Sequence, residues 1–220
     1  MNLRYLRLCL VTYFNQVPFP QYQQFILQAA RGGITSVQLR DKKESLVLLT
    51  KALQLKKILT PFHVPLIINN HVRLAKDIDA EGVHIGQGDM SPEKARAILG
   101  PDKIIGLSIE SFEELERANQ YTHEIDYVAA SAVFPSKIKQ DCKKIWGLDA
   151  LSEFRLRAKH PVVGIGGIKH HNVVSIMQTG IDGVAVVGAI HDAPNPEHAA
   201  KQMISQIDDF LGEEKTCRFR

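Results

Sequence analysis

The sequence predicts an α/β fold, a (β/α)8 TIM barrel in a single domain, on two observations. Short β-branched runs recur along the whole chain, and each is followed by an amphipathic stretch of helix length. The runs are almost continuously apolar, as is typical of parallel strands buried on both faces. The chain has 220 residues, so each of eight units has about 27, somewhat fewer than in a typical barrel of about 250 residues. The predicted strands are Leu8–Thr12, Ser36–Arg40, Leu66–Asn69, Gly82–Ile85, Ile104–Ser108, Tyr127–Ala130, Val162–Gly164 and Gly183–Val187.

Capping and helix-breaking residues mark the segments between these strands. The pair Gly32-Gly33 and the later Pro61 each end a helical stretch. The pair Ser91-Pro92 begins another, and Ser111 with Glu114 forms a capping-box pattern. Other predicted helices are Gln21–Arg31, Glu44–Leu59, Leu148–Ala158, His170–Gln178 and Pro196–Leu211.

An open doubly wound sheet is the structural alternative, and its phosphate-binding loop is missing. After the first predicted strand the chain reads Tyr13-Phe14-Asn15-Gln16, which contains no glycine. The cluster Gly164–Ile168 comes late in the chain, and Lys169 stands where a dinucleotide-binding motif needs its last glycine. The barrel is therefore the prediction. We assign residues 1–211 to it and expect the charged tail, residues 212–220, to fray.

The charge and the apolar pattern exclude several classes of partner. Twenty-seven basic and 24 acidic residues give a net charge of +3. The basic cluster at Lys137, Lys139, Lys143 and Lys144 is too short for a groove that follows a nucleic acid. No apolar run reaches the roughly 18 residues of a membrane span. We therefore expect neither a nucleic acid nor a membrane as a partner.

The cysteines and the first residues indicate the compartment. Cys9, Cys142 and Cys217 are odd in number and widely spaced, so they form neither a disulfide framework nor a metal-binding pair. The first fourteen residues lead to no small-residue cleavage site, so we expect no signal peptide. These features favour a cytoplasmic protein with reduced thiols.

Polar residues and glycines gather where the predicted strands end. In a TIM barrel the active site lies at the carboxyl ends of the strands. The loops at Gly166-Gly167 and Gly188-Ala189 predict a phosphate site after the last two strands, because glycine lets the backbone approach an anion closely. The alternative interpretation is a simple tight turn.

Basic residues at other strand ends indicate a second anion. Arg40, Lys42 and Lys139 follow the second and sixth strands and suit a small polyanion such as a pyrophosphate. Asp89 is the best-placed carboxylate, and Mg²⁺ binds one or two carboxylates together with substrate phosphates. Asp89 could instead cap the helix that begins near Ser91.

Seven segments occur in the order of a known family. They are GGITSVQLRDK (32–42), PLIINN (65–70), GVHIGQGD (82–89), IIGLS (104–108), YVAASAVFPSKIKQD (127–141), PVVGIGGI (161–168) and GIDGVAVVGAI (180–190). By this ordered set the chain resembles the thiamine phosphate synthases of the thiamine phosphate synthase/thiazole tautomerase superfamily. The resemblance implies a transferase of a pyrimidinylmethyl group that needs Mg²⁺. Hydroxymethylpyrimidine pyrophosphate would lose pyrophosphate through a carbocation, and thiazole phosphate would then bond to the carbocation to give thiamine phosphate.

The resemblance also implies roles for individual residues. The pyrimidine would face Gln38, and Mg²⁺ would be bound by Asp89. The residues that would hold the pyrophosphate are Arg40, Lys42, Asn69 and Lys139. Those that would line the substrate rings and bind their phosphates are Ser108, Ser136, Gly167, Gly188 and Ala189. We count as catalytic Arg40, Lys42, Ser108 and Lys139.

Four positions depart from the pattern of the family. Asn70 replaces the aspartate that would be a second Mg²⁺ ligand, which should weaken the binding of a hard cation. Ile138 replaces a hydroxyl residue, and Gly188 replaces a serine but keeps the backbone groups. Glu110 replaces the acid–base histidine of the tautomerase branch, which counts against that activity.

Three other hypotheses remain open at this point, one of which is a thiazole tautomerase-like protein. The departures at Asn70, Ile138 and Gly188 allow a non-catalytic protein that binds or senses a thiamine-related ligand. The glycine loops by themselves allow another phosphate-handling barrel. Under each hypothesis the partners are small phosphorylated molecules, and a homodimer stays open.

The remaining histidines and the tryptophan receive structural interpretations. His84 lies in a predicted strand and is expected to be a packed, hydrogen-bonded histidine that lines the barrel. Trp146 is either a local clasp or part of a lid. The histidines expected at the surface are His63, His123, His160, His170 and His171.

Overall fold

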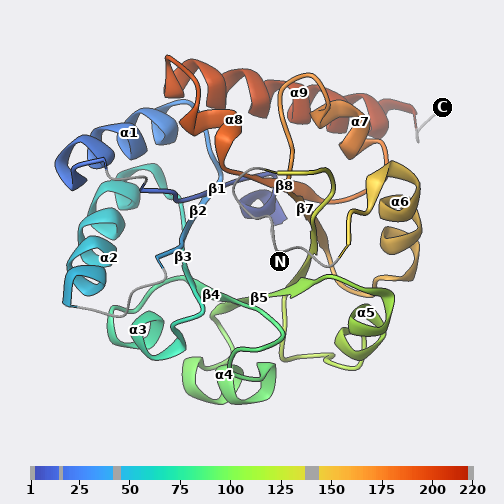
Figure 1. Ribbon diagram of the computed structural model, residues 1–220, viewed down its shortest axis with the longest axis horizontal. Coiled ribbons are helices and arrows are strands. Elements are labelled where there is room, and N and C mark those ends of the chain that lie inside the picture. The colour runs from blue at the N-terminus through green and yellow to red at the C-terminus, as the bar shows by residue number, and fades with distance from the viewer. Residues whose placement is uncertain (1–2, 15–16, 42–45, 137–143, 218–220) are drawn as a thin grey trace.

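A computed structural model describes residues 3–14, 17–41, 46–136 and 144–217 and confirms the predicted fold. Eight parallel strands form one closed barrel in the order of the chain, and helices surround it (Figure 1). Each observed strand ends within one residue of its predicted bounds. The strands are β1 (Leu8–Val11), β2 (Ser36–Leu39), β3 (Leu66–Asn69), β4 (Gly82–Ile85), β5 (Ile104–Ile109), β6 (Tyr127–Ser131), β7 (Val162–Ile165) and β8 (Gly183–Val186).

The helices match the prediction less closely than the strands. Two short helices, α3 and α8, were not predicted, because a single turn or two gives little periodic signal. The helices are α1 (Phe19–Arg31), α2 (Leu46–Leu59), α3 (Val72–Asp77), α4 (Pro92–Leu99), α5 (Phe112–Ala118), α6 (Gly147–Arg157), α7 (Val173–Met177), α8 (Gly188–His191) and α9 (Pro196–Cys217), with 3-10 turns η1 (Leu3–Leu6) and η2 (Thr60–Phe62).

Three helix ends correct the sequence analysis. Helix α1 begins at Phe19, before the predicted Gln21, where Pro20 suits a first turn. Helix α7 begins at Val173 rather than His170, because Asn172 has a non-helical backbone and its Oδ1 accepts a hydrogen bond from Lys169 N (2.8 Å). Helix α9 continues through Gly212 to Cys217 instead of ending at residue 211. A single glycine inside a helix costs only about 1 kcal/mol, so it does not end the helix.

Capping is confirmed at α5 and takes another form at α4. The side chain of Ser111 accepts a hydrogen bond from Glu114 N, as the capping-box pattern predicts. The Glu114 carboxylate in turn accepts a hydrogen bond from the N–H of Glu110 (2.6 Å). At α4, Ser91 occupies the cap position without a side-chain cap bond. Asp89 does not cap this helix, because its Oδ2 accepts a hydrogen bond from Gly86 N (2.6 Å).

Alternate strand residues build two hydrophobic clusters. One face of each strand packs against the helices in the larger cluster, which contains for example Leu66, Ile68 and Val128. The other face points into the barrel, where Tyr127 is accompanied by small side chains such as Ala129 and Ala185. Because small side chains do not fill the barrel, space remains along its axis.

Tyr127 and the turn η1 close the barrel at the amino ends of the strands. Gly106 is the partner of Tyr127 in the β5–β6 register, and the tyrosine ring lies where a side chain at 106 would stand. The ring of Tyr5, from η1, meets the Tyr127 ring edge-on at 6.4 Å. Figure 1 shows the N-terminal turn near the centre of the barrel.

Trp146 is a clasp rather than a lid residue. Its side chain is buried, and its Nε1–H donates to the carbonyl of Ser131 (3.1 Å). Its ring packs edge-on against Phe112 and Phe154 from helices α5 and α6. The tryptophan thus fastens the segment after residue 143 to the barrel.

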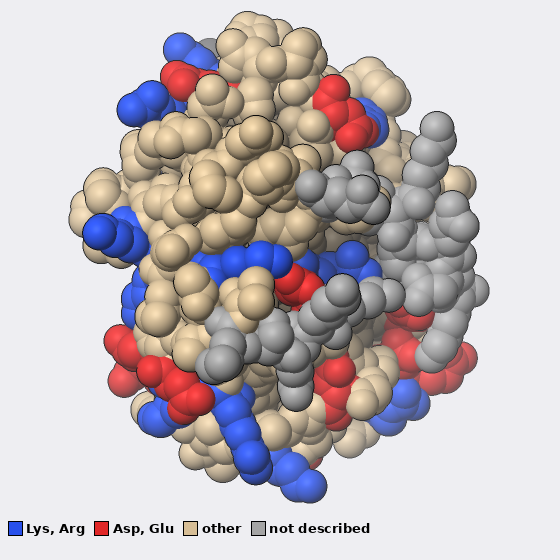
Figure 2. Space-filling view, turned by 60° about the vertical axis from the view of Figure 1, so that its left-hand side comes forward, with Lys and Arg blue, Asp and Glu red and all other residues tan. Residues whose placement is uncertain are grey.

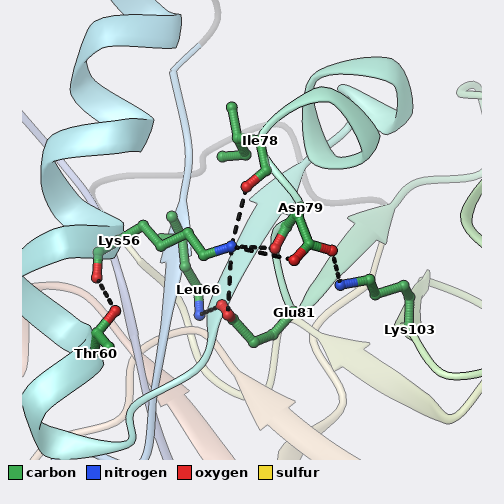
Figure 3. A network of polar contacts seen from close by, with 7 residues as sticks. All are labelled: Lys56, Thr60, Leu66, Ile78, Asp79, Glu81 and Lys103. Atoms are coloured by element: carbon green, nitrogen blue, oxygen red, sulfur yellow. Dashed lines mark hydrogen bonds and ion pairs between the residues drawn. The ribbon is translucent and has the colours of Figure 1, made fainter.

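A polar network ties α2 to the amino ends of β3, β4 and β5 (Figure 3). The ammonium of Lys56 donates to the carbonyls of Ile78 (3.0 Å) and Asp79. Glu81 Oε2 accepts a hydrogen bond from the N–H of Leu66 (2.8 Å). The Lys103 ammonium hydrogen-bonds to Asp79 and holds the pKa of that carboxyl below its ordinary value.

Replacing Lys56 with methionine should destabilise the fold without affecting the cavity at the other end of the barrel. Methionine keeps most of the apolar stem but leaves the two carbonyls without their charged donor, so we expect the free energy of unfolding to fall by about 1–2 kcal/mol. Urea denaturation measures the change. The exposed neighbour Lys57→Met is the matched control, and an equal loss in both variants would contradict the structural role of Lys56.

Candidate active site

A cavity of about 840 Å³ opens at the carboxyl ends of the strands and continues into the barrel. Most of the residues predicted for the site line it. They are Gln38, Arg40, Asn69, Asn70, Asp89, Ser108, Ser136, Gly167 and Gly188, and the departure at Glu110 lines the cavity as well. The predicted site residues Lys42 and Lys139, and the departure at Ile138, lie outside the described residues. Ala189 is buried and does not line the cavity.

Arg40 is held at the cavity mouth by its backbone. Its N–H donates to Thr12 Oγ1 (2.9 Å), and the Thr12 hydroxyl donates to the Arg40 carbonyl (3.2 Å). Thr12 itself is buried at the end of β1. Among the described residues the Arg40 guanidinium has no ion-pair partner, so its charge is available to an anion in the cavity.

A layer of polar side chains lies below the mouth. The buried His84 is hydrogen-bonded through Nε2 to Ser108 Oγ (2.8 Å) and through Nδ1 to the Tyr127 hydroxyl (2.9 Å). This confirms the expectation of a packed, satisfied histidine that lines the barrel. Gln38 is buried beside it, and Asn69 Nδ2 lies 3.4 Å from Gln38 Oε1. These groups present hydrogen-bond donors and acceptors to the interior of the cavity.

Burial keeps the Cys9 thiol and the Tyr127 hydroxyl protonated in the barrel interior. It raises the pKa of the Cys9 thiol to about 11. It likewise raises the pKa of Tyr127 well above its ordinary value. Because a thiolate rather than a thiol is the strong nucleophile, Cys9 is unreactive at neutral pH. Neither the Cys9 thiol nor the Tyr127 hydroxyl is therefore an activated nucleophile in the deep part of the cavity.

The glycines after β7 are required by packing as well as by their backbone angles. Gly166 and Gly167 have φ values of 103° and 64°, which disfavour any residue with a side chain. A Cβ on Gly167 would lie 2.6 Å from Phe134 Cβ, and one on Gly166 would lie 2.5 Å from Ala132 Cβ. The loop after β6 thus packs directly on this turn, and both glycines line the cavity.

Asp89 and Asn70 bring oxygen atoms to another part of the mouth. Asp89 closes its own loop through the bond from Gly86 N described above. Asn70 has φ 66°, a left-handed conformation that asparagine tolerates, and its N–H donates to the carbonyl of His84 (2.8 Å). Asn70 and Asp89 are hard oxygen donors that suit Mg²⁺, provided that other groups complete its coordination. No cluster of three His, Cys, Asp or Glu able to hold a metal occurs within the described ranges.

The cavity is also lined by polar residues that were not predicted for the site, among them Gln87, Lys169 and Asp192. Gln87 Nε2 donates to the carbonyl of Ser108 (2.8 Å), which links the loops after β4 and β5. Lys169 and Asp192 form an ion pair beside Gly188. No sequence motif indicates that Lys169 and Asp192 belong to the site. Their loops lie together because β7 and β8 are neighbours in the barrel.

Charges are mixed on the face that carries α1 and α2. Figure 2 shows Lys and Arg interspersed there with Asp and Glu, with a short basic row near the centre of the view. Over the described part of this face the basic side chains form no broad surface. Among the described residues, no helix is long and apolar enough to cross a membrane.

The fold and the cavity define a class, the barrel enzymes whose active site lies at the carboxyl ends of the strands. The model of the thiamine monophosphate synthase family matches residues 8–190. A thiamine-phosphate synthase of Chlamydia caviae is 38% identical over 212 residues, 96% of this chain and 99% of the relative. Another, of Vibrio parahaemolyticus, is 41% identical over 203 residues, 92% and 98% of the two chains. This chain therefore belongs to the thiamine monophosphate synthase family.

One solved structure agrees with this assignment, and a second shares the fold. Thiamine phosphate pyrophosphorylase from Pyrococcus furiosus is 30% identical with a TM-score of 0.85, and the match covers 95% of this chain and 98% of that one. A 3-hexulose-6-phosphate synthase matches with a TM-score of 0.70 at 15% identity, over 91% of this chain and 99% of that one. The second likeness shows the shared barrel alone.

Proposed function

We propose that this protein is a transferase that joins hydroxymethylpyrimidine pyrophosphate to thiazole phosphate. The C–O bond to pyrophosphate would break first, leaving a pyrimidine carbocation and free pyrophosphate. The thiazole ring nitrogen would then donate its electron pair to the exposed methylene carbon, which gives thiamine phosphate. Membership of the family supports this reaction, and so does the distribution of charge in the cavity.

The observation that carries the proposal is a cation at the mouth above a polar interior whose thiol and phenol groups are protonated. Arg40 would stabilise the charge that develops on the departing pyrophosphate, a preorganised electrostatic effect. Gln38 and Ser108 would orient the pyrimidine by hydrogen bonds, with His84 and Tyr127 fixing the Ser108 hydroxyl. A carbocation survives only where no strong nucleophile traps it, and the protonated Cys9 thiol meets that condition.

Mg²⁺ would be bound at the mouth by Asp89 and the amide oxygen of Asn70. Both residues line the cavity, and the substrate phosphates would supply further oxygen ligands. When bound, the ion would neutralise part of the charge of the pyrophosphate. Lys42 and Lys139, which lie outside the described residues, remain predicted ligands of the same group.

Product formation tests the proposed function directly. The purified protein, both substrates and Mg²⁺ should yield thiamine phosphate and pyrophosphate in equal amounts, with each product measured separately. A protein that binds thiamine phosphate by calorimetry but forms none at high enzyme concentration would instead be the non-catalytic homologue. Turnover of other phosphorylated compounds in place of this pair would indicate a different phosphate-handling barrel.

Changing Asn70 to aspartate should lower the Mg²⁺ concentration that gives half-maximal activity. A carboxylate binds a hard cation more strongly than an amide does, and aspartate tolerates the left-handed backbone of this position. We expect the half-maximal concentration to fall by about 3–10-fold, from the magnesium dependence of initial rates. The control is Asn70→Gly, which keeps the backbone angle and removes the amide. A requirement that is equal in all three proteins would place residue 70 away from the metal.

A further inference from the structure

The cavity contains a second described cation, Lys169, in the loop after β7. Its Nζ lies 3.2 Å from Asp192 Oδ2, just after α8, and both residues line the cavity. The side chains of Lys169 and Asp192 are 42% and 70% exposed, so the pair is open to solvent and to a ligand. An exposed ion pair contributes little to stability, so an incoming anion can exchange with the aspartate at little cost.

This ion pair lies where a side chain at position 188 would stand. A Cβ on Gly188 would be 2.6 Å from Asp192 Oδ2 and 3.1 Å from Lys169 Nζ. The absent side chain therefore makes room for the ammonium, which is next to the backbone of the loop after β8. An anion close to Gly188 would meet the Lys169 charge.

Lys169 is attached to a rigid loop. Its N–H donates to Asn172 Oδ1 (2.8 Å), and Asn172 Nδ2 donates to the carbonyl of Gly167 (3.1 Å). Asp192 follows a helix that is anchored in the same way. His191 is hydrogen-bonded to the Tyr22 hydroxyl (2.7 Å) and to the carbonyl of Val187 (2.9 Å). Both partners of the ion pair thus extend from fixed backbone.

Lys169 and Arg40 are separated around the barrel. Arg40 follows β2 and Lys169 follows β7, with β1 and β8 between these strands. They are the only Lys or Arg that line the cavity within the described ranges. A reaction between a pyrophosphate and a phosphate ester brings two anionic groups into one cavity, and two separated cations can bind one group each.

We propose that Lys169 binds the phosphate group of the thiazole substrate and that Asp192 is its counter-ion when this substrate is absent. The inference rests on the proposed function and assigns one of its two anionic groups to a residue of this chain. Phosphate, with up to two negative charges, displaces the single Asp192 carboxylate from the ammonium. Lys169 and Asp192 then set the affinity for the second substrate and leave bond breaking in the first substrate unaffected.

Steady-state kinetics of Lys169→Met tests this assignment. The KM for thiazole phosphate should rise about 10–100-fold, while kcat and the KM for the pyrimidine pyrophosphate change by less than about threefold. Lys169→Arg should restore most of the affinity. Asp192→Asn should lower the KM for thiazole phosphate by about 2–5-fold, because the competing carboxylate is gone. The control is Lys201→Met, an exposed lysine of α9 outside the cavity.

A binding measurement separates this inference from the reaction itself. Calorimetry with thiazole phosphate alone should show binding to the wild-type protein that weakens in Lys169→Met and strengthens in Asp192→Asn. That result together with absent turnover would refute the proposed function but support the phosphate site. Turnover with an unchanged KM in Lys169→Met would overturn the inference and leave a structural ion pair, and so would the absence of binding to the wild-type protein.

Discussion

Replacing Arg40 with alanine should reduce kcat/KM by about 10²–10³-fold while the barrel stays folded. The guanidinium is at the cavity mouth and has no ion-pair partner within the described part of the chain, so its charge acts on the ligand rather than on the fold. Its position depends on the backbone bonds to Thr12, which alanine retains. Under the proposed function this charge would stabilise the departing pyrophosphate, so its loss should weaken binding of the transition state more than binding of the ground state.

Initial rates measure the loss of activity in Arg40→Ala, and thermal unfolding shows whether the protein stays folded. Two further variants separate the effect of this charge from other effects of the substitution. Arg40→Lys should recover part of the activity, because it keeps the charge but loses the two-pronged geometry of the guanidinium. The exposed Arg73→Ala, on α3, controls for the loss of any arginine. Wild-type kinetics in Arg40→Ala with an unchanged melting temperature would show that the pyrophosphate binds elsewhere.

The second large effect is expected at Gly106, inside the barrel. A Cβ on this residue would lie 2.2 Å from Tyr127 Cζ and 2.5 Å from its hydroxyl oxygen. The ring has little room to move, because Tyr5 packs on it and His84 is hydrogen-bonded to its hydroxyl. Gly106→Ala should therefore lower the free energy of unfolding by about 3 kcal/mol. It should also reduce activity, since His84 orients Ser108.

Chemical denaturation of a double-mutant cycle distinguishes this clash from a general effect of alanine. Gly106→Ala combined with Tyr127→Ala should lose less stability than the sum of the single changes, because the smaller residue 127 removes the overlap. Gly88→Ala is the matched control, since a Cβ there would meet nothing within 4 Å. If the two losses of stability were strictly additive, the Tyr127 ring would not occupy the place of a Cβ on residue 106.

The strands were predictable because their chemistry is local. Runs such as Leu66–Asn69 and Gly82–Ile85 are apolar and short, and the barrel buries both of their faces, so composition alone marks their bounds. Glu114 lies three residues after Ser111, within reach of one helical turn, so that cap was predictable as well. The start of α7 was not predictable. The Asn172 side chain accepts a hydrogen bond from the N–H of Lys169, and such a bond competes with the formation of a helix there.

Patterns along the chain were enough to predict the barrel, the end of the barrel at which the cavity opens, and the positions of Gln38, Arg40 and Ser108 at strand ends. The strands follow from the apolar pattern of a few consecutive residues. The end of the barrel then follows from the rule that TIM-barrel active sites lie at the carboxyl ends of the strands. The ion pair of Lys169 and Asp192 beside Gly188 could be found only in the folded molecule. That arrangement depends on β7 and β8 lying side by side, and separation along the chain does not encode the distance between side chains in space.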